Sequence, residues 1–205
     1  PPARSPVSTP VRKVVVTGPF GAGKTTFATT VTQGLGDGTL TTTETGVSDE
    51  TAALKSSTTV ALDHTSFLVP PAPASAWAPT RVTLFGTPGQ ERFAFMWELL
   101  AQNMHGYLVL VDASRSTSIA QAADIVAAFA RIAPRSPRLV AVSRWADPAG
   151  TRTRLAHLLG TSPAALVPCD PRDLDQSTTV LRLLLDGIHT LEGLSAPAAP
   201  VGAEA

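Results

Sequence analysis

Short apolar runs rich in β-branched residues alternate along the chain with stretches whose apolar residues recur at helical spacing. The runs predict strands at 11–18, 58–69, 81–86, 106–113, 138–143 and 164–169. The helical pattern predicts helices at 23–35, 91–105, 117–133, 151–159 and 174–191. Strands that alternate with helices indicate an α/β fold with a largely parallel sheet, whose ligands bind at the carboxyl ends of the strands.

The proline-rich segment 70–79 joins two of these strands and predicts a loop between them. The strands at 58–69 and 81–86 should therefore form a hairpin, which adds one antiparallel edge strand to the sheet. Two helices carry a clear apolar face, formed by Ile119, Ala122, Val126 and Phe129 in one and by Val180, Leu181, Leu184, Ile188 and Leu191 in the other.

Length and composition favour one well-buried domain. The chain has 205 residues, of which 43% are apolar and 16% charged, and its formal net charge is zero. That balance argues against a nucleic-acid-binding protein, which would show a basic stripe. We expect a domain at 11–191 between disordered tails at 1–10 and 192–205, because Pro- and Ala-rich ends bury little surface.

The cysteine content and the lack of targeting signals in this sequence predict a cytoplasmic protein. The single cysteine, Cys169, rules out an internal disulfide and suits a reducing compartment; a buried thiol is the favoured interpretation. No apolar run approaches the length of a membrane span, so we expect no integral membrane segment. Neither a signal-peptide pattern nor a prenylation cysteine is present in this sequence.

The segment GPFGAGKT (18–25) fits the phosphate-loop pattern G-x-x-x-x-G-K-[ST] between a predicted strand and a predicted helix. Its glycines allow several backbone N–H groups to converge on phosphate oxygens, and the helix N-terminus adds its dipole. Lys24 supplies a charge to the β and γ phosphates, and the Thr25 hydroxyl is placed to bind Mg²⁺. The predicted phosphate-binding residues are Gly18, Pro19, Phe20, Gly21, Ala22, Gly23, Lys24, Thr25 and Thr26.

A second motif, LFGTPGQERF (84–93), follows a strand expected to neighbour the phosphate loop. Gly89 could donate its N–H to a γ phosphate, and Gln90 could orient an attacking water. Together with VTGPFGAGKTTF (16–27), TTVALD (58–63) and LVLVDASR (108–115), this segment resembles the bacterial Ras-like small GTPases of the conservon and MglA-like family. The resemblance covers about residues 11–191.

The resemblance implies a three-layer Ras-like P-loop NTPase that acts as a GTP-dependent switch with Mg²⁺. Its implied partners are regulatory proteins of the roadblock or longin type, or a GTPase-activating partner. Gly86 occupies the place of the aspartate that Ras-type GTPases carry, a trait that this family shares. Gln90 and Lys24 are the implied catalytic residues.

The predicted metal ligands are Thr25 and a threonine of the first switch segment. The resemblance favours Thr59, with Thr58 as its competitor. Asp63 lies four residues after Thr59 on the same strand face, so it could replace the missing aspartate, although an ordinary strand-end carboxylate is the favoured interpretation.

Residues 34–58 are polar and rich in Gly and Thr, which is typical of a functional or disordered loop. No arginine lies in 34–80, whereas the MglA relatives carry one before the switch threonine. Because such an arginine accelerates hydrolysis by ~10³–10⁵, slow intrinsic hydrolysis is expected. Phe95 and Leu99 fall off the apolar stripe of their helix and are candidates for a partner surface.

The base site is less well marked. A Ras-type site reads guanine through Asn-Lys-x-Asp, and the chain offers Ser143, Arg144, Trp145 and Ala146 at these positions, with Asp147 one residue late. Either the loop bulges so that Asp147 reaches the base, or discrimination is weak. Arg144 or Trp145 could stack on a purine. Asp170, after the last strand, is a second candidate.

Two other functions remain open from the sequence alone. A pseudo-GTPase would bind nucleotide and recruit partners with little hydrolysis. An ATPase or small-molecule kinase is the third possibility, because the strand GYLVLVD (106–112) ends in Asp112 like a Walker B element. The histidines show no metal spacing and no catalytic-triad arrangement.

Overall fold

A computed structural model describes residues 9–35, 41–47, 58–87 and 95–195; for 41–47, 58–63, 95 and 195 it describes the backbone. The strands are β1 (Val11–Thr17), β2 (Thr41–Val47), β3 (Thr58–Val69), β4 (Thr80–Gly86), β5 (Gly106–Asp112), β6 (Arg138–Ser143) and β7 (Leu166–Pro168). The helices are α1 (Lys24–Gly34), α2 (Phe95–Ala101), α3 (Ser116–Ile132), α4 (Pro148–Leu158) and α5 (Leu174–Ser195), with a 3₁₀ turn at Pro163–Ala165.

The described strands form one sheet in the order β2-β3-β4-β1-β5-β6-β7. β1 lies at the centre and pairs in parallel with β4 and β5, and β6 and β7 continue the parallel order. β3 runs antiparallel to β4, so the predicted hairpin across segment 70–79 is confirmed. The mostly parallel α/β fold expected for a P-loop NTPase is therefore confirmed.

One strand was not predicted. Residues 41–47, inside the segment interpreted as a loop, form β2, which pairs antiparallel with β3. The antiparallel strand β3 is consequently the second strand of the sheet, and β2 is its edge. The sequence TTTETGV has no apolar alternation, so the pattern on which the strand predictions rest is missing here. The strand is defined by its antiparallel pairing with β3.

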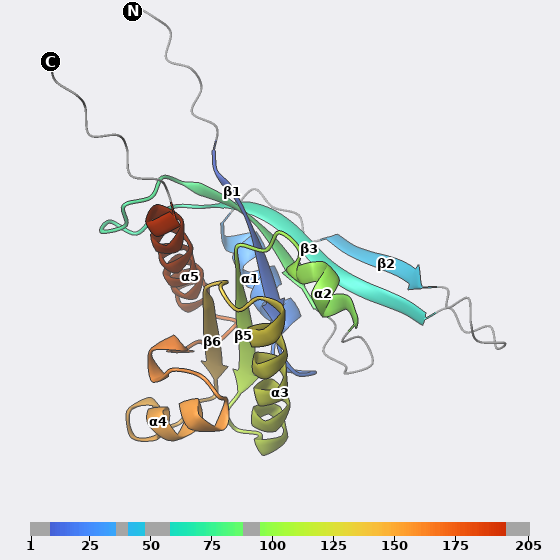
Figure 1. Cartoon of the computed structure of the whole chain (residues 1–205), viewed down its shortest axis with the longest axis vertical. Helices are drawn as coiled ribbons and strands as arrows, with labels where there is room; N and C mark the ends of the chain where they lie inside the picture. The colour runs from blue at the N-terminus through green and yellow to red at the C-terminus, as the bar shows by residue number, and fades with distance from the viewer. Residues whose placement is uncertain (1–8, 36–40, 48–57, 88–94, 196–205) are drawn as a thin grey trace, which may run out of the picture.

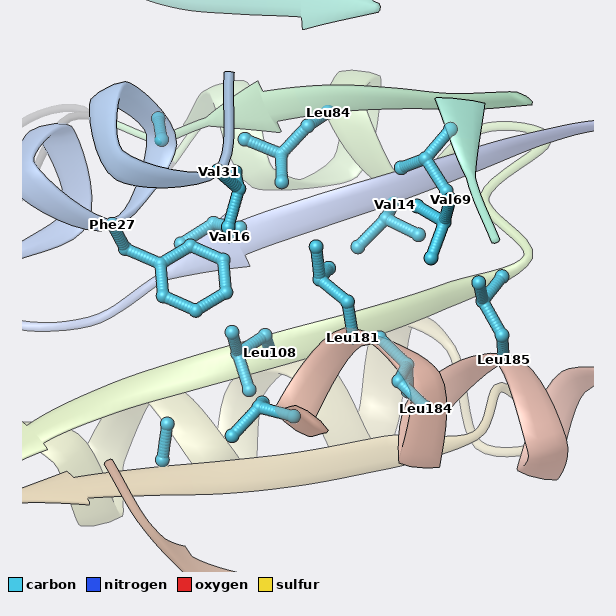
Figure 2. Packing of buried hydrophobic residues seen from close by; sticks show 14 of the residues in the cluster. Val14, Val16, Phe27, Val31, Val69, Leu84, Leu108, Leu181, Leu184 and Leu185 are labelled. Atoms are coloured by element: carbon cyan, nitrogen blue, oxygen red, sulfur yellow. The ribbon is translucent and has the colours of Figure 1, made fainter. Parts of the chain in front are cut away.

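Helices cover both faces of the sheet and make three layers (Figure 1). α1 and α5 pack on one face, where Phe27, Val31, Leu181 and Leu184 meet the inward residues of the strands (Figure 2). α2, α3 and α4 pack on the other face around residues such as Phe129. The alternating strand residues thus divide between two cores, which is why β5 is buried along its whole length.

Three helix boundaries differ from the expectation by three or four residues, and one of them is the start of α4, at Pro148 and not at 151. α2 ends at Ala101 and not at 105, because Asn103 adopts a left-handed conformation with φ 56° and turns the chain into β5. α5 continues to Ser195, so residues 192–195 of the predicted tail are helical. The remaining tail residues, 1–8 and 196–205, lie outside the described residues. Among the described helices, none combines the length and apolar character that a membrane crossing requires.

Candidate nucleotide site

The phosphate loop follows the central strand β1, between the ends of its parallel neighbours β4 and β5. This position is the carboxyl edge of the sheet, where ligands of α/β proteins bind. Gly18 has φ 143°, and a Cβ there would overlap the backbone carbonyl of Leu110 in β5. Glycine at position 18 therefore lets the loop turn directly across the neighbouring strand.

The loop closes into the first turn of α1. Ala22 N–H donates to the Pro19 carbonyl at 3.2 Å, and Gly23, with φ 98°, is the N-cap residue. A Cβ on Gly23 would lie 2.8 Å from Cγ of Pro171, so this position also requires glycine. The backbone N–H groups of the first turn point towards the N-terminus of α1, which favours an anion there.

Lys24 lies at this turn and keeps its ammonium group on the loop. Its Nζ donates to the carbonyl oxygens of Gly18 at 2.8 Å and Pro19 at 2.9 Å. The loop therefore holds the charge beside its own backbone N–H groups. Phe20 has 69% of its surface exposed at the crown of the loop, and Thr25 and Thr26 are exposed on the first turn of α1.

An arginine from another element reaches the same loop. Arg115 caps the start of α3, three residues after the end of β5, and its side chain is exposed. A Cβ at position 21 would lie 3.1 Å from Nη1 of Arg115, so the guanidinium group packs on Gly21. Sequence reasoning assigned Arg115 no role. The available signal was an arginine directly after the strand that neighbours β1.

The second motif begins next to the phosphate loop. Gly86 pairs with Val16 of β1, and the buried Thr87 donates its N–H to the Val16 carbonyl at 2.9 Å. The Thr87 hydroxyl donates to Thr17 Oγ1 at 2.8 Å, which fixes the exit of the chain from β4. Gly89 and Gln90, which were predicted to act on the γ phosphate, lie outside the described residues.

The predicted switch I residues can be placed by backbone register alone. Thr59 lies in β3 opposite Gly46 of β2, and His64 pairs with Phe85 of β4. Asp63 pairs with Thr42 of β2 and lies in the middle of β3, not at a strand end. Their side chains are outside the described part, so the predicted roles of Thr59 and Asp63 stay predictions. In the part of the chain that the structure describes, no group of three His, Cys, Asp or Glu side chains is arranged to hold a metal ion.

Asp112 ends β5 with a fully buried side chain that joins three segments. Its Oδ1 accepts from the N–H and hydroxyl of Ser114 at 3.0 and 2.6 Å, and its Oδ2 accepts from Nη1 of Arg144. Burial alone would raise the pKa of this carboxyl, but the hydrogen bonds from Ser114 and Arg144 outweigh it and lower the pKa below its ordinary value. Both oxygens are thus engaged by the protein.

The residues expected to read the base have contacts within the protein. The Ser143 hydroxyl donates to the Val111 carbonyl at 3.3 Å, and the Trp145 indole donates to Thr151 Oγ1 at 2.8 Å. Arg152 lies over the Trp145 ring, 5.1 Å from its centroid, so this ring packs towards α4. Arg144, with φ 50°, points to Asp112.

Both candidate carboxylates also have partners of their own. Asp147 caps α4 by accepting from Gly150 N–H at 2.8 Å. Asp170 forms a bidentate ion pair with Arg172, and the hydrogen bonds from Arg172 lower its pKa to about 2. The Asp170 N–H donates to Oε1 of Gln176 at 3.0 Å. These contacts hold both carboxylates within the protein, and their predicted contact with a base stays a prediction.

Cys169, beside this loop, is a buried thiol as predicted. It is 3% exposed and lies 3.9 Å from the Ser177 hydroxyl. Burial raises the pKa of the thiol to about 11, which disfavours the reactive thiolate at neutral pH.

Comparison with known families agrees with the phosphate loop. The family model described as "Conserved hypothetical ATP binding protein" matches residues 16–148, which is more than half of the chain. The matched segment runs from β1 through the loop to the start of α4. No curated protein matches the chain significantly. The protein therefore belongs to this family of nucleotide-binding proteins with a P-loop-type α/β fold.

Proposed function

We propose that the protein is a Mg²⁺-dependent switch that binds GTP and hydrolyses it slowly. The observation that carries this proposal is the phosphate loop, with Lys24 bonded to the carbonyls of Gly18 and Pro19 beside the N-terminus of α1. Guanine is favoured by the resemblance of residues 84–97 and 108–115 to the conservon and MglA-like GTPases.

Magnesium fits the chemistry of this loop. Thr25 offers a hydroxyl on the first turn of α1, and nucleotide phosphates and waters complete the octahedral shell that Mg²⁺ prefers. Thr59 is the second proposed protein ligand. The ion would neutralise charge on the β and γ phosphates. Gln90 is proposed to orient the attacking water.

An ATP hydrolase is the second candidate. Asp147 and Asp170, the carboxylates proposed to accept from guanine N1 and N2, already accept from Gly150 and Arg172. A carboxylate that already accepts such bonds has less capacity left to accept from guanine, and weaker pairing means weaker discrimination between purines, since specificity rests on paired polar groups. The family description also names ATP.

Signalling is proposed to pass through the segment after Gln90. Leu99 of α2 has 61% of its surface exposed, whereas Met96 and Leu100 on the neighbouring face are buried. A large apolar side chain exposed beside the second switch segment is a contact that a regulatory partner of the roadblock or longin type could bind.

The test is the nucleotide content and turnover of the purified protein. Nucleotide released by denaturation would be identified, and binding of GTP and ATP with Mg²⁺ would be compared with phosphate release. We expect bound GDP or GTP and slow turnover that falls further in Gln90→Ala. Lys24→Ala should weaken binding about 10- to 100-fold, since it loses charge-assisted contacts, while Lys13→Ala at the start of β1 should not.

The other outcomes select between the alternatives. A preference for ATP would favour the hydrolase of the second candidate. Tight binding with no turnover, alone or with partners, would favour a pseudo-GTPase that acts as an interaction module. Failure to bind either nucleotide would contradict the proposal as a whole.

A further inference from the structure

Arg115 occupies a position from which it can act on a nucleotide bound at the phosphate loop. β5 is the parallel neighbour of β1, so the segments that leave the two strands lie side by side at the carboxyl edge. Arg115 belongs to the segment after β5, and its Nη1 packs on Gly21 at the middle of the loop. A side chain at position 21 would crowd the guanidinium group, because the Cβ alone would come within 3.1 Å of it.

The backbone of Arg115 is held by a rigid element. Its N–H donates to the Asp112 carbonyl at 3.3 Å, and its carbonyl accepts from Ile119 N–H at 3.2 Å, the first hydrogen bonds of α3. The Ser118 hydroxyl accepts from Asp112 N–H at 3.1 Å, which ties this helix start to the end of β5. The arginine is therefore presented by the sheet and α3, not by residues 36–57.

Other cations at this edge are committed to partners within the protein. Arg144 pairs with Asp112, Arg172 pairs with Asp170, and Lys24 donates to loop carbonyls. Among the described residues, no ion pair involves Arg115. An exposed guanidinium group that packs on a loop of converging N–H groups adds to the positive potential of that loop.

We propose that Arg115 is a phosphate-contacting arginine supplied in cis, which donates to phosphate oxygens of the bound nucleoside triphosphate. This inference rests on the proposed function and names a residue of that same site. A guanidinium fork matches two phosphate oxygens, which a lysine cannot do.

Arg115 acts on the charge that hydrolysis creates. The water oxygen forms a bond to the γ phosphorus while the bond from that phosphorus to the β–γ bridging oxygen breaks. The electron pair of the broken bond stays on the diphosphate, and both protons of the water leave with the inorganic phosphate as H₂PO₄⁻. Arg115 stabilises the negative charge that grows on the diphosphate oxygens.

Arg115 would add a modest acceleration to the slow hydrolysis proposed above. The expectation of slow hydrolysis rested on the lack of arginine in residues 34–80, whereas Arg115 comes from beyond the second motif. Because Arg115 is exposed to water, its contribution should be smaller than the ~10³–10⁵ of an arginine in a closed site. We expect about 10- to 100-fold, the equivalent of one or two charge-assisted hydrogen bonds.

The experiment compares Arg115→Gln and Arg115→Lys with Arg131→Gln, an exposed arginine in the last turn of the same helix. We would measure single-turnover hydrolysis with whichever of GTP or ATP the protein prefers, and the affinity for that triphosphate and for its nucleoside. The melting temperature would be measured without ligand. Arg115→Gln should slow hydrolysis about 10- to 100-fold, Arg115→Lys should be intermediate, and Arg131→Gln should match the wild type.

A purely structural role would give a different pattern. It would lower the melting temperature of the ligand-free protein. The hydrolysis rate and the affinity for the nucleoside would then fall by the same factor. Wild-type hydrolysis and triphosphate affinity in Arg115→Gln would overturn the inference while leaving the proposed function intact. If the wild type binds the triphosphate but does not hydrolyse it, Arg115→Gln must lose at least about tenfold in triphosphate affinity and keep its nucleoside affinity. In that case, a triphosphate affinity equal to that of the wild type would overturn the inference. A wild type that binds no nucleotide would overturn both.

Discussion

The buried carboxylate of Asp112 shows how a single residue can resemble a catalytic group and yet join segments of the fold. It ends a strand beside the phosphate loop, as a Walker B aspartate does. Its two oxygens, however, accept hydrogen bonds from Ser114 and Arg144, whose side chain is 64% exposed. Burial of an ionised group is tolerated only with such partners. The contacts therefore support a structural role for Asp112.

Asp112→Asn tests that role. The amide cannot accept the same charged hydrogen bonds, so we expect the free energy of unfolding at pH 7 to fall by about 1–3 kcal/mol in urea titration. The exposed Asp124→Asn of α3 should change it by less than about 0.5 kcal/mol. A variant that keeps wild-type stability but loses turnover would instead support a metal-binding role.

The pH dependence gives a second measurement on the same pair. The folded state lowers the pKa of Asp112 below its ordinary value of 3.8, so the folded state favours the ionised form. The stability that this carboxylate contributes is therefore present above about pH 4 and is lost as the pH falls further. The difference in the free energy of unfolding between the wild type and Asp112→Asn should therefore become smaller below about pH 4.

At the scale of elements, the proline-rich segment between β3 and β4 is fastened to α5. The Trp77 indole donates to Oδ1 of Asp186 at 2.6 Å, and the ring stacks on His189 at 5.5 Å between centroids. The Ser75 hydroxyl donates to the same carboxylate oxygen at 3.2 Å. Trp77 belongs to the core under α1 and α5, so this contact orders a segment whose composition is typical of a loop.

Trp77→Phe should distinguish the contribution of the hydrogen bond to Asp186 from that of the packed ring. The variant keeps an aromatic ring but loses the donor to a carboxylate, so we expect a loss of about 1–2 kcal/mol in the free energy of unfolding. Trp145→Phe is the matched control, because its indole donates to the exposed Thr151 hydroxyl, and it should cost less than about 0.5 kcal/mol. Equal effects of the two variants would show that the Asp186 bond does not stabilise the fold.

An element could be predicted from the sequence when it has a buried face, because that face leaves an apolar pattern in the sequence. The central strands and α3 follow from their apolar periodicity, and the phosphate loop follows from glycines that the neighbouring backbone demands. β2 has no apolar pattern, so only its backbone pairing with β3 defines it. The base loop was hard to predict for a related reason: the orientations of Asp147 and Asp170 depend on Gly150 and Arg172, two or three residues away, and motif spacing does not account for these contacts.

At the scale of the whole molecule, the phosphate loop lies where both cores and the two central strands meet. β1 contributes Val14 and Val16 to the core under α1 and α5, and Val15 to the core on the opposite face. A change in the loop that displaces β1 from β5 should therefore destabilise the molecule globally as well as remove nucleotide binding.

Gly18→Ala makes that prediction specific. Its methyl group would overlap the Leu110 carbonyl of β5, which is backbone and cannot rotate away, so one of the two central strands must shift. We expect a loss of about 2–4 kcal/mol in the free energy of unfolding and loss of the stabilisation by nucleotide. For the wild type, ligand at 100 times its dissociation constant should add about 2.7 kcal/mol, seen as a higher melting temperature.

Gly160→Ala is the control that separates steric overlap from backbone strain. Gly160 follows α4 with φ 62°, but a Cβ there would meet no atom within 4 Å. Its cost should be only that of a left-handed alanine, about 1–2 kcal/mol, with the full nucleotide-induced rise in melting temperature retained. If Gly18→Ala and Gly160→Ala lost equal stability and both kept that rise, the close approach of the loop to β5 would have no part in nucleotide binding. If only Gly18→Ala loses the rise, the contact between the two central strands is a requirement of the site.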